Sequence, residues 1–99
     1  MSGYYVRAQS LRDQAVAYDK HAVDVTDVRN TLRAAFDRDR SSLGNDEYGA
    51  ELAKKLPGIE SGIFDGFKAF IDELEGIATG LRANAGNYER ADSPGSRDA

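Results

Sequence analysis

Hydrophobic and polar residues alternate over the first forty positions with the period of an α-helix. Apolar residues follow one another at steps of four and three, which places them on one stripe of a helix. The stripe consists of Tyr4, Ala8, Leu11, Ala15, Tyr18, Ala22, Val25, Arg29, Leu32 and Phe36. Arg29 is its one charged member, and the aliphatic stem of an arginine can cover an apolar seam. Because no proline or glycine interrupts this pattern, we expect one helix over residues 4–40.

A turn is predicted over residues 41–45, where serine, glycine and asparagine gather. The turn motif comprises Leu43, Gly44, Asn45, Asp46, Tyr48 and Gly49. The side-chain oxygen of Asn45 or Asp46 can accept hydrogen bonds from the free amides of a following first turn. A second helix is therefore expected over residues 46–91. If the chain folds back around residue 43, Tyr4 faces the neighbourhood of Arg82, and Tyr88 lies beyond the end of the first helix.

The second helix has an interruption and a wide apolar face. Pro57 and Gly58 predict a kink or a fresh start, because proline lacks an amide donor and crowds the preceding turn. From Ile59 onward the apolar face is three rows wide. Its rows are Phe67, Leu74, Leu81 and Tyr88 in the centre, Ile63, Phe70 and Ile77 on one side, and Phe64, Ile71, Ala78 and Ala85 on the other.

One neighbouring helix cannot cover a face of three rows, so the pattern predicts a partner chain. The fold expected is all-α: a long antiparallel helical hairpin that associates as a four-helix-bundle dimer. The predicted dimer interface comprises Phe64, Phe67, Phe70, Ile71, Leu74, Ile77 and Leu81, with Gly76 and Gly80 beside them.

Small residues form a second stripe along the same helix. Its members are Gly62, Gly66, Ala69, Glu73, Gly76, Gly80 and Ala83. Each glycine in a helix interior costs up to about 1 kcal/mol relative to alanine. Two interpretations remain open: another backbone approaches closely along this stripe, or packing elsewhere makes the glycines tolerable.

Composition narrows the class of function. The chain has 99 residues, a formal net charge of −4 and no cysteine, which suits a single domain without a disulfide or a thiolate nucleophile. The acidic balance disfavours nucleic acid and anionic membranes as partners. The start of the chain lacks the pattern of a secretory signal peptide, and charges such as Asp65 and Lys68 disfavour a transmembrane helix. Residues 93–99 have the composition of a disordered tail.

No group of residues predicts catalysis, a metal or a cofactor. His21 is the only histidine, so a typical zinc site is not expected. Asp37 and Asp39 resemble the start of a calcium loop, but Ser42 and Tyr48 stand where that loop needs glycine and an acid. We therefore do not expect an enzyme.

The chain resembles the WXG superfamily, small helical hairpins exported by the type VII (ESX) secretion systems of actinobacteria and other Gram-positive bacteria. The resemblance covers residues 4–92 and rests on the hairpin pattern and on Tyr88 and Asp92, which form a Tyr-x-x-x-Asp sequence near the end of the second helix. It implies a C-terminal secretion signal at these two residues. It also implies dimers with itself or a related protein, contact with a secretion ATPase, and a cytoplasmic stage before secretion or display at the cell surface. The Trp-x-Gly turn of the family is absent, and Leu43-Gly44 stands there instead.

Two other functions stay open at this stage. A cytosolic helical adaptor or structural bundle would need the same hairpin and no export. Tyr88 would then be the last core residue and Asp92 a solvated helix end. Membrane activity after export, through the face around Phe67, is disfavoured by the acidic balance.

Overall fold

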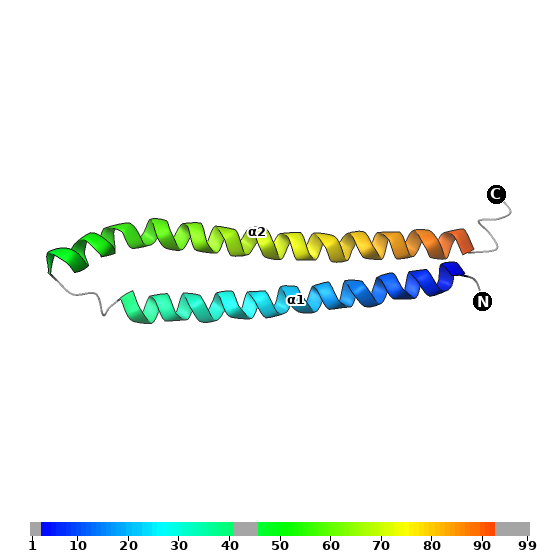
Figure 1. Ribbon diagram of the computed structural model, residues 1–99, viewed down its shortest axis with the longest axis horizontal. Helices are drawn as coiled ribbons and strands as arrows, with labels where there is room; N and C mark the ends of the chain where they lie inside the picture. The colour runs from blue at the N-terminus through cyan, green and yellow to red at the C-terminus, as the bar shows by residue number, and fades with distance from the viewer. Residues whose placement is uncertain (1–2, 41–45, 93–99) are drawn as a thin grey trace. The chain divides into compact units, whose positions relative to one another are not determined.

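The computed structural model describes residues 3–40 and 46–92, and these residues form two helices (Figure 1). Helix α1 spans Gly3–Arg40 and helix α2 spans Glu47–Asp92. The two helices pair as an antiparallel hairpin, which confirms the all-α hairpin predicted from the sequence. Dimer formation stays a prediction. Residues 41–45, where the turn is predicted, and residues 93–99, where the tail is predicted, lie outside the described residues.

Asp46 caps the start of α2. Its Oδ1 accepts a hydrogen bond from the amide of Gly49 at 2.7 Å, and its carbonyl accepts one from the amide of Ala50 at 2.9 Å. An aspartate in this place satisfies an amide that has no partner inside the helix, and its charge suits the positive end of the helix dipole. Of the two candidate caps, Asp46 therefore fills the role in the described residues.

Helix α2 continues through Pro57 as one element, so of the two outcomes expected at Pro57-Gly58 the fresh start does not occur, and the kink stays a prediction. Proline removes the hydrogen bond that the carbonyl of Ala53 would otherwise accept. Ala53 and Pro57 are both exposed, so water can supply the missing donor.

The chain divides into two compact units. The first, which we term the alanine unit, contains residues 3–22 of α1 and 72–92 of α2. Its buried side chains are Ala8, Ala15, Ala22, Leu74, Ala78 and Ala85. Ion pairs from Arg12 to Glu89 and from Asp19 to Arg82 join the two helices across this core.

The second unit, which we term the aromatic unit, contains residues 23–40 of α1 and 46–71 of α2. Phe64 and Ile71 are its buried apolar side chains. The Phe36 ring meets Phe64 edge to face, with ring centroids 6.0 Å apart, and the guanidinium carbon of Arg33 lies 3.8 Å from the Phe64 centroid. This unit therefore centres on one aromatic ring that α1 covers from two positions.

These contacts fix the register of the hairpin and correct the predicted one. Arg82 lies opposite Asp19 and not near Tyr4, because the two helices do not pair symmetrically about residue 43. Within the aromatic unit, Arg40 ends α1 and lies opposite Glu60. Residues 47–59 of α2, which we term the α2 tip, therefore extend past the last residue of α1.

Candidate functional site

Tyr88, the aromatic half of the predicted secretion signal, lies alongside α1 and not beyond its end. It lines a shallow groove with Leu11, Asn84, Asn87 and Ala91, and its side chain is half-buried. The expectation that Tyr88 projects past α1 is therefore wrong, for the same reason of register. Tyr88 contributes to the packing of the alanine unit, and part of the residue stays exposed to solvent.

Polar groups surround this groove. Arg12 of α1 pairs with Glu89, which follows Tyr88, and Arg90 donates a hydrogen bond to the side-chain oxygen of Asn87. A half-buried aromatic side chain beside amide and charged groups is a surface that a polypeptide can recognise by both apolar contact and hydrogen bonds. Asp92, the other half of the predicted signal, is the last residue of α2, one turn after Tyr88.

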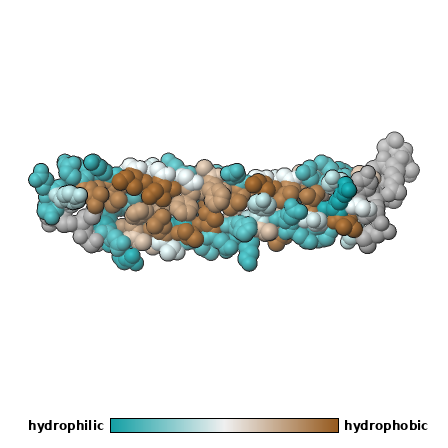
Figure 2. Space-filling model, in the orientation of Figure 1, coloured by the Kyte–Doolittle hydropathy of each residue, from teal (hydrophilic) through white to brown (hydrophobic). Residues whose placement is uncertain are grey.

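The predicted dimer interface divides into an inner and an outer set. Phe64, Ile71 and Leu74 are buried inside the hairpin, so within one chain they belong to its core. Phe67 and Leu81 are half-buried. On the outer side, Phe70 is 49% exposed and Ile77 is 38% exposed. Figure 2 shows hydrophobic residues that reach the surface among hydrophilic ones.

The glycines of the second stripe, which consists of small residues, lie beside this outer set and face open space. A Cβ atom built on Gly62, Gly66, Gly76 or Gly80 would meet nothing within 4 Å. No close approach of α1 therefore explains these glycines. Both interpretations of the glycines therefore stay open. A backbone that approaches them closely would have to belong to another chain, and otherwise packing elsewhere makes them tolerable.

The described part of the turn motif lies at the start of α2. Asp46 is the helix cap, Gly49 is half-buried, and Tyr48 is 87% exposed. Leu43, Gly44 and Asn45 lie outside the described residues. An aromatic side chain that is almost fully exposed contributes little to the fold of its own chain, which makes Tyr48 a candidate contact residue.

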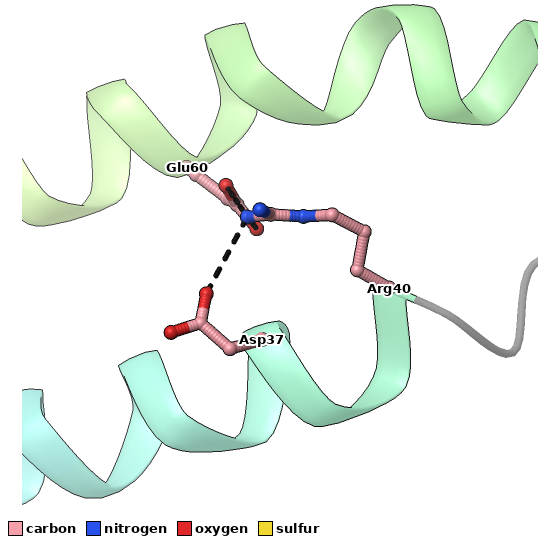
Figure 3. Close-up of polar contacts among 3 residues, drawn as sticks. All are labelled: Asp37, Arg40 and Glu60. Atoms are coloured by element: carbon pink, nitrogen blue, oxygen red, sulfur yellow. Dashed lines mark hydrogen bonds and ion pairs between the residues drawn. The ribbon is translucent and has the colours of Figure 1, made fainter.

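A cluster that the sequence analysis did not predict joins the two helices (Figure 3). It consists of Asp37 and Arg40 at the end of α1 and Glu60 of α2. One terminal nitrogen of Arg40 donates to both carboxylate oxygens of Glu60, at 2.6 and 2.8 Å, and lies 3.6 Å from Asp37. The hydrogen bond to Glu60 and its charge raise the pKa of the Arg40 guanidinium above its ordinary value. Glu60 is the one buried charged residue among those described.

The sequence did carry a signal for Glu60. Counting back seven residues from Phe67, along the central row of the apolar face, leads to Glu60 and not to an apolar residue. A carboxylate at a core position needs a cation or hydrogen-bond donors from the neighbouring helix. Arg40, in the last turn of α1, fulfils that need.

No metal site or membrane span was found in the part of the chain that the structure describes. No group of three or more possible metal ligands occurs in residues 3–40 and 46–92, and neither helix there is apolar enough over a sufficient length to cross a membrane. His21 is exposed and contacts the ring of Tyr18 edge to face at 6.3 Å.

Comparison with models of protein families, with curated proteins and with solved structures finds no match for the chain.

Proposed function

We propose that this chain is a substrate or an export partner of a type VII secretion system, and that it acts by protein–protein contact. Tyr88 and Asp92 form the secretion signal, which the secretion ATPase or an associated receptor reads. The partner in export is a second copy or a related helical hairpin. The chain is cytoplasmic before export and is then secreted or held at the cell surface.

The main support for this proposal is the position of Tyr88 on α2. Its half-buried side chain stands in the final turns of a helical hairpin, four residues before the helix ends at Asp92. A receptor can contact the open side of the ring at the end of the hairpin without unfolding the core. The hairpin itself and the exposed Phe70 and Ile77 agree with a protein that works through helical partners.

A cytosolic helical adaptor without export is the second candidate. The contact that favours it is the groove, where Tyr88 packs beside Leu11 of α1. A tyrosine whose task is to close the core would lie in the same way. The two functions therefore differ in what the exposed part of the ring does.

Export of point variants separates the two candidates. We expect Tyr88→Ala and Asp92→Ala to abolish export in a host with a matching secretion locus, measured as the ratio of protein in the culture supernatant to protein in the lysate. Because Tyr88 is half-buried, its truncation should also cost about 1–2 kcal/mol of folding stability. A urea unfolding curve of each variant therefore accompanies the export assay.

Two controls isolate the signal from the fold. Leu11→Ala removes the other side of the groove and leaves Tyr88 and Asp92 in place, so it should lower stability and preserve export. Tyr48→Ala removes an exposed tyrosine elsewhere and should change neither. Normal export of Tyr88→Ala and Asp92→Ala would exclude the secretion signal. Loss of export in Leu11→Ala to the same degree would mean that export depends on the intact fold and not on these two residues. Absence of the native chain from the supernatant would favour the adaptor.

A further inference from the structure

The α2 tip, residues 47–59, carries an apolar row of its own. Tyr48, Leu52, Leu56 and Ile59 follow at steps of four, four and three, which places them on one face of the helix. Leu52 is 41% exposed and Ile59 is 48% exposed, while Leu56 is half-buried. Four apolar side chains in a row, with Tyr48 almost fully exposed, form a surface that a helix of a partner can cover.

Helix α1 does not cover this row, because it ends where Arg40 meets Glu60. Among the described residues, the shallow pocket at the start of the tip is lined by side chains of α2 and its cap alone. These are Asp46, Glu47, Tyr48, Glu51, Leu52 and Lys55. The register of the hairpin therefore leaves Tyr48, Leu52 and Ile59 of the row exposed, while Leu56 is half-buried.

The two edges of the apolar row differ in charge. Glu51 and Lys55, one helical turn apart, flank it on one edge, and Gly49 and Ala53 flank it on the other. Both charged residues are exposed, and Glu51 forms an ion pair with Lys54 at 3.4 Å. The charged edge thus carries an acid toward the start of the tip and a base toward its end.

We propose that the α2 tip binds the α2 tip of a second copy of this chain, with the two helices antiparallel and related by a two-fold axis. In such a pair each edge of one helix faces the same edge of the other. Glu51 of each copy then meets Lys55 of the other, so the charged edge is complementary to itself. A parallel pair would place the charged edge against Gly49 and Ala53, with no gain of charge pairing.

The apolar row requires the same register as the charges. An antiparallel pair that sets Glu51 level with Lys55 brings Tyr48 level with Ile59, and Leu52 level with Leu56, to within about two residues, or about 3 Å along the axis. Large side chains then alternate along the contact and fill it from both copies. Charge and apolar pattern agree on one arrangement, which is the reason to name a second copy as the occupant.

This contact is small, because each copy contributes four apolar side chains. Stable complexes bury at least about 1,200 Å² in total, so the tip contact belongs with weak, concentration-dependent associations. It uses residues other than Phe70 and Ile77, and it does not depend on export or on Tyr88.

Charge reversal tests the proposal. Five samples of the full chain are compared by sedimentation equilibrium, at low salt, from about 10 µM to about 1 mM. They are the native chain, Glu51→Lys, Lys55→Glu, an equal mixture of these two variants, and the double variant with both changes. Either single change places like charges opposite each other in both symmetry-related pairs, so we expect each alone to weaken association about tenfold.

The mixture and the double variant should restore association, because opposite charges then face each other again. Circular dichroism checks that all samples are equally helical. Association through Phe70 and Ile77 would be the same in all five samples and so cannot imitate this pattern. The proposal is overturned if the native chain shows no association, if the single variants associate as the native chain does, or if the mixture associates no more than its components.

Discussion

The alanine unit and the aromatic unit use the same two helices but fill the space between them differently. In the alanine unit, α1 contributes Ala8, Ala15 and Ala22, all buried. In the aromatic unit, α1 contributes the Phe36 ring and the Arg33 guanidinium, and both contact Phe64 of α2. One unit therefore depends on many small contacts, and the other depends on one large side chain.

This difference decides where each unit is sensitive to change. A phenylalanine buries on the order of 150–250 Å² of surface, so removal of Phe64 deprives the aromatic unit of much of its core at once. An alanine buries little area, but Ala15 has no exposed surface left and thus no room for a larger side chain. The aromatic unit is therefore sensitive to truncation, and the alanine unit is sensitive to enlargement.

The candidate functional residues are divided between the units in the same way. Tyr88 stands in the alanine unit, and the α2 tip belongs to the aromatic unit. A substitution in one core can therefore be used to disturb one candidate surface while the other serves as an internal reference.

The largest effect is expected for Phe64→Ala, which should lower the free energy of unfolding by about 3–5 kcal/mol. Urea denaturation measures this value. Phe70→Ala, on the same helix but about half exposed, is the matched control and should cost much less. Hydrogen exchange should show faster opening in residues 23–40 and 47–71 than in 3–22 and 72–92. If Phe64→Ala accelerated hydrogen exchange equally in both units, the aromatic unit would not be the more sensitive of the two to truncation of this ring.

An intermediate effect is expected for Ala15→Leu, which should lower the free energy of unfolding by about 1–3 kcal/mol through overpacking. Ala17→Leu, on the exposed side of the same stretch of α1, is the control and should be close to neutral. Thermal unfolding followed by circular dichroism measures both. A stabilised Ala15→Leu variant would show that the helices of the alanine unit can separate to admit a larger core.

The sequence predicted the two helices because their apolar residues recur at helical spacing over long stretches. The stripe from Ala8 to Phe36 contains every residue of α1 whose side chain the structure describes as buried. Local chemistry also predicted a cap at Asn45 or Asp46, since capping depends on residues within one turn, and Asp46 supplies it. Patterns of this kind depend on neighbours in the chain, and one sequence suffices to read them.

The register of the hairpin could not be predicted in the same way. A stripe of alternating steps packs nearly as well when one helix slides along the other by a heptad, so the periodicity alone does not choose among registers. Specific pairs between the helices, such as Arg40 with Glu60, make that choice. The predicted place of Tyr88 beyond the end of α1 was wrong because it assumed a tight turn around residue 43.

The sequence alone could not tell which of the three rows of the apolar face is buried and which is exposed. The row with Phe64 and Ile71 is buried against α1, while the row with Phe70 and Ile77 remains the most exposed. The sequence predicts that the face is too wide for one neighbour, but both outer rows are apolar. Only the position of α1 decides which row stays available to a partner.

The smallest effects concern the ion pairs between the helices, where the two units can be compared with one type of substitution. Arg40→Ala and Arg82→Ala both remove an arginine that is about half exposed, 51% and 43% at the side chain, so they lose similar packing of the stem. The acids left behind differ. The Glu60 side chain is 11% exposed, whereas that of Asp19 is 45% exposed and can be hydrated. Arg40→Ala should therefore lower the urea midpoint more than Arg82→Ala, because a buried carboxylate without a partner is costly.

Two controls accompany the comparison of Arg40→Ala with Arg82→Ala: a measurement at high salt and the variant Arg38→Ala. The small loss in Arg82→Ala should shrink further at high salt, which screens exposed pairs, while the loss in Arg40→Ala should persist. Arg38→Ala controls for position, since Arg38 also lies in the last turn of α1 but pairs with the exposed Asp39. If Arg38→Ala matched Arg40→Ala, the effect would come from a cation at the helix end and not from Glu60. If Arg40→Ala and Arg82→Ala were equal at both salt concentrations, burial of the acid would not distinguish the two units.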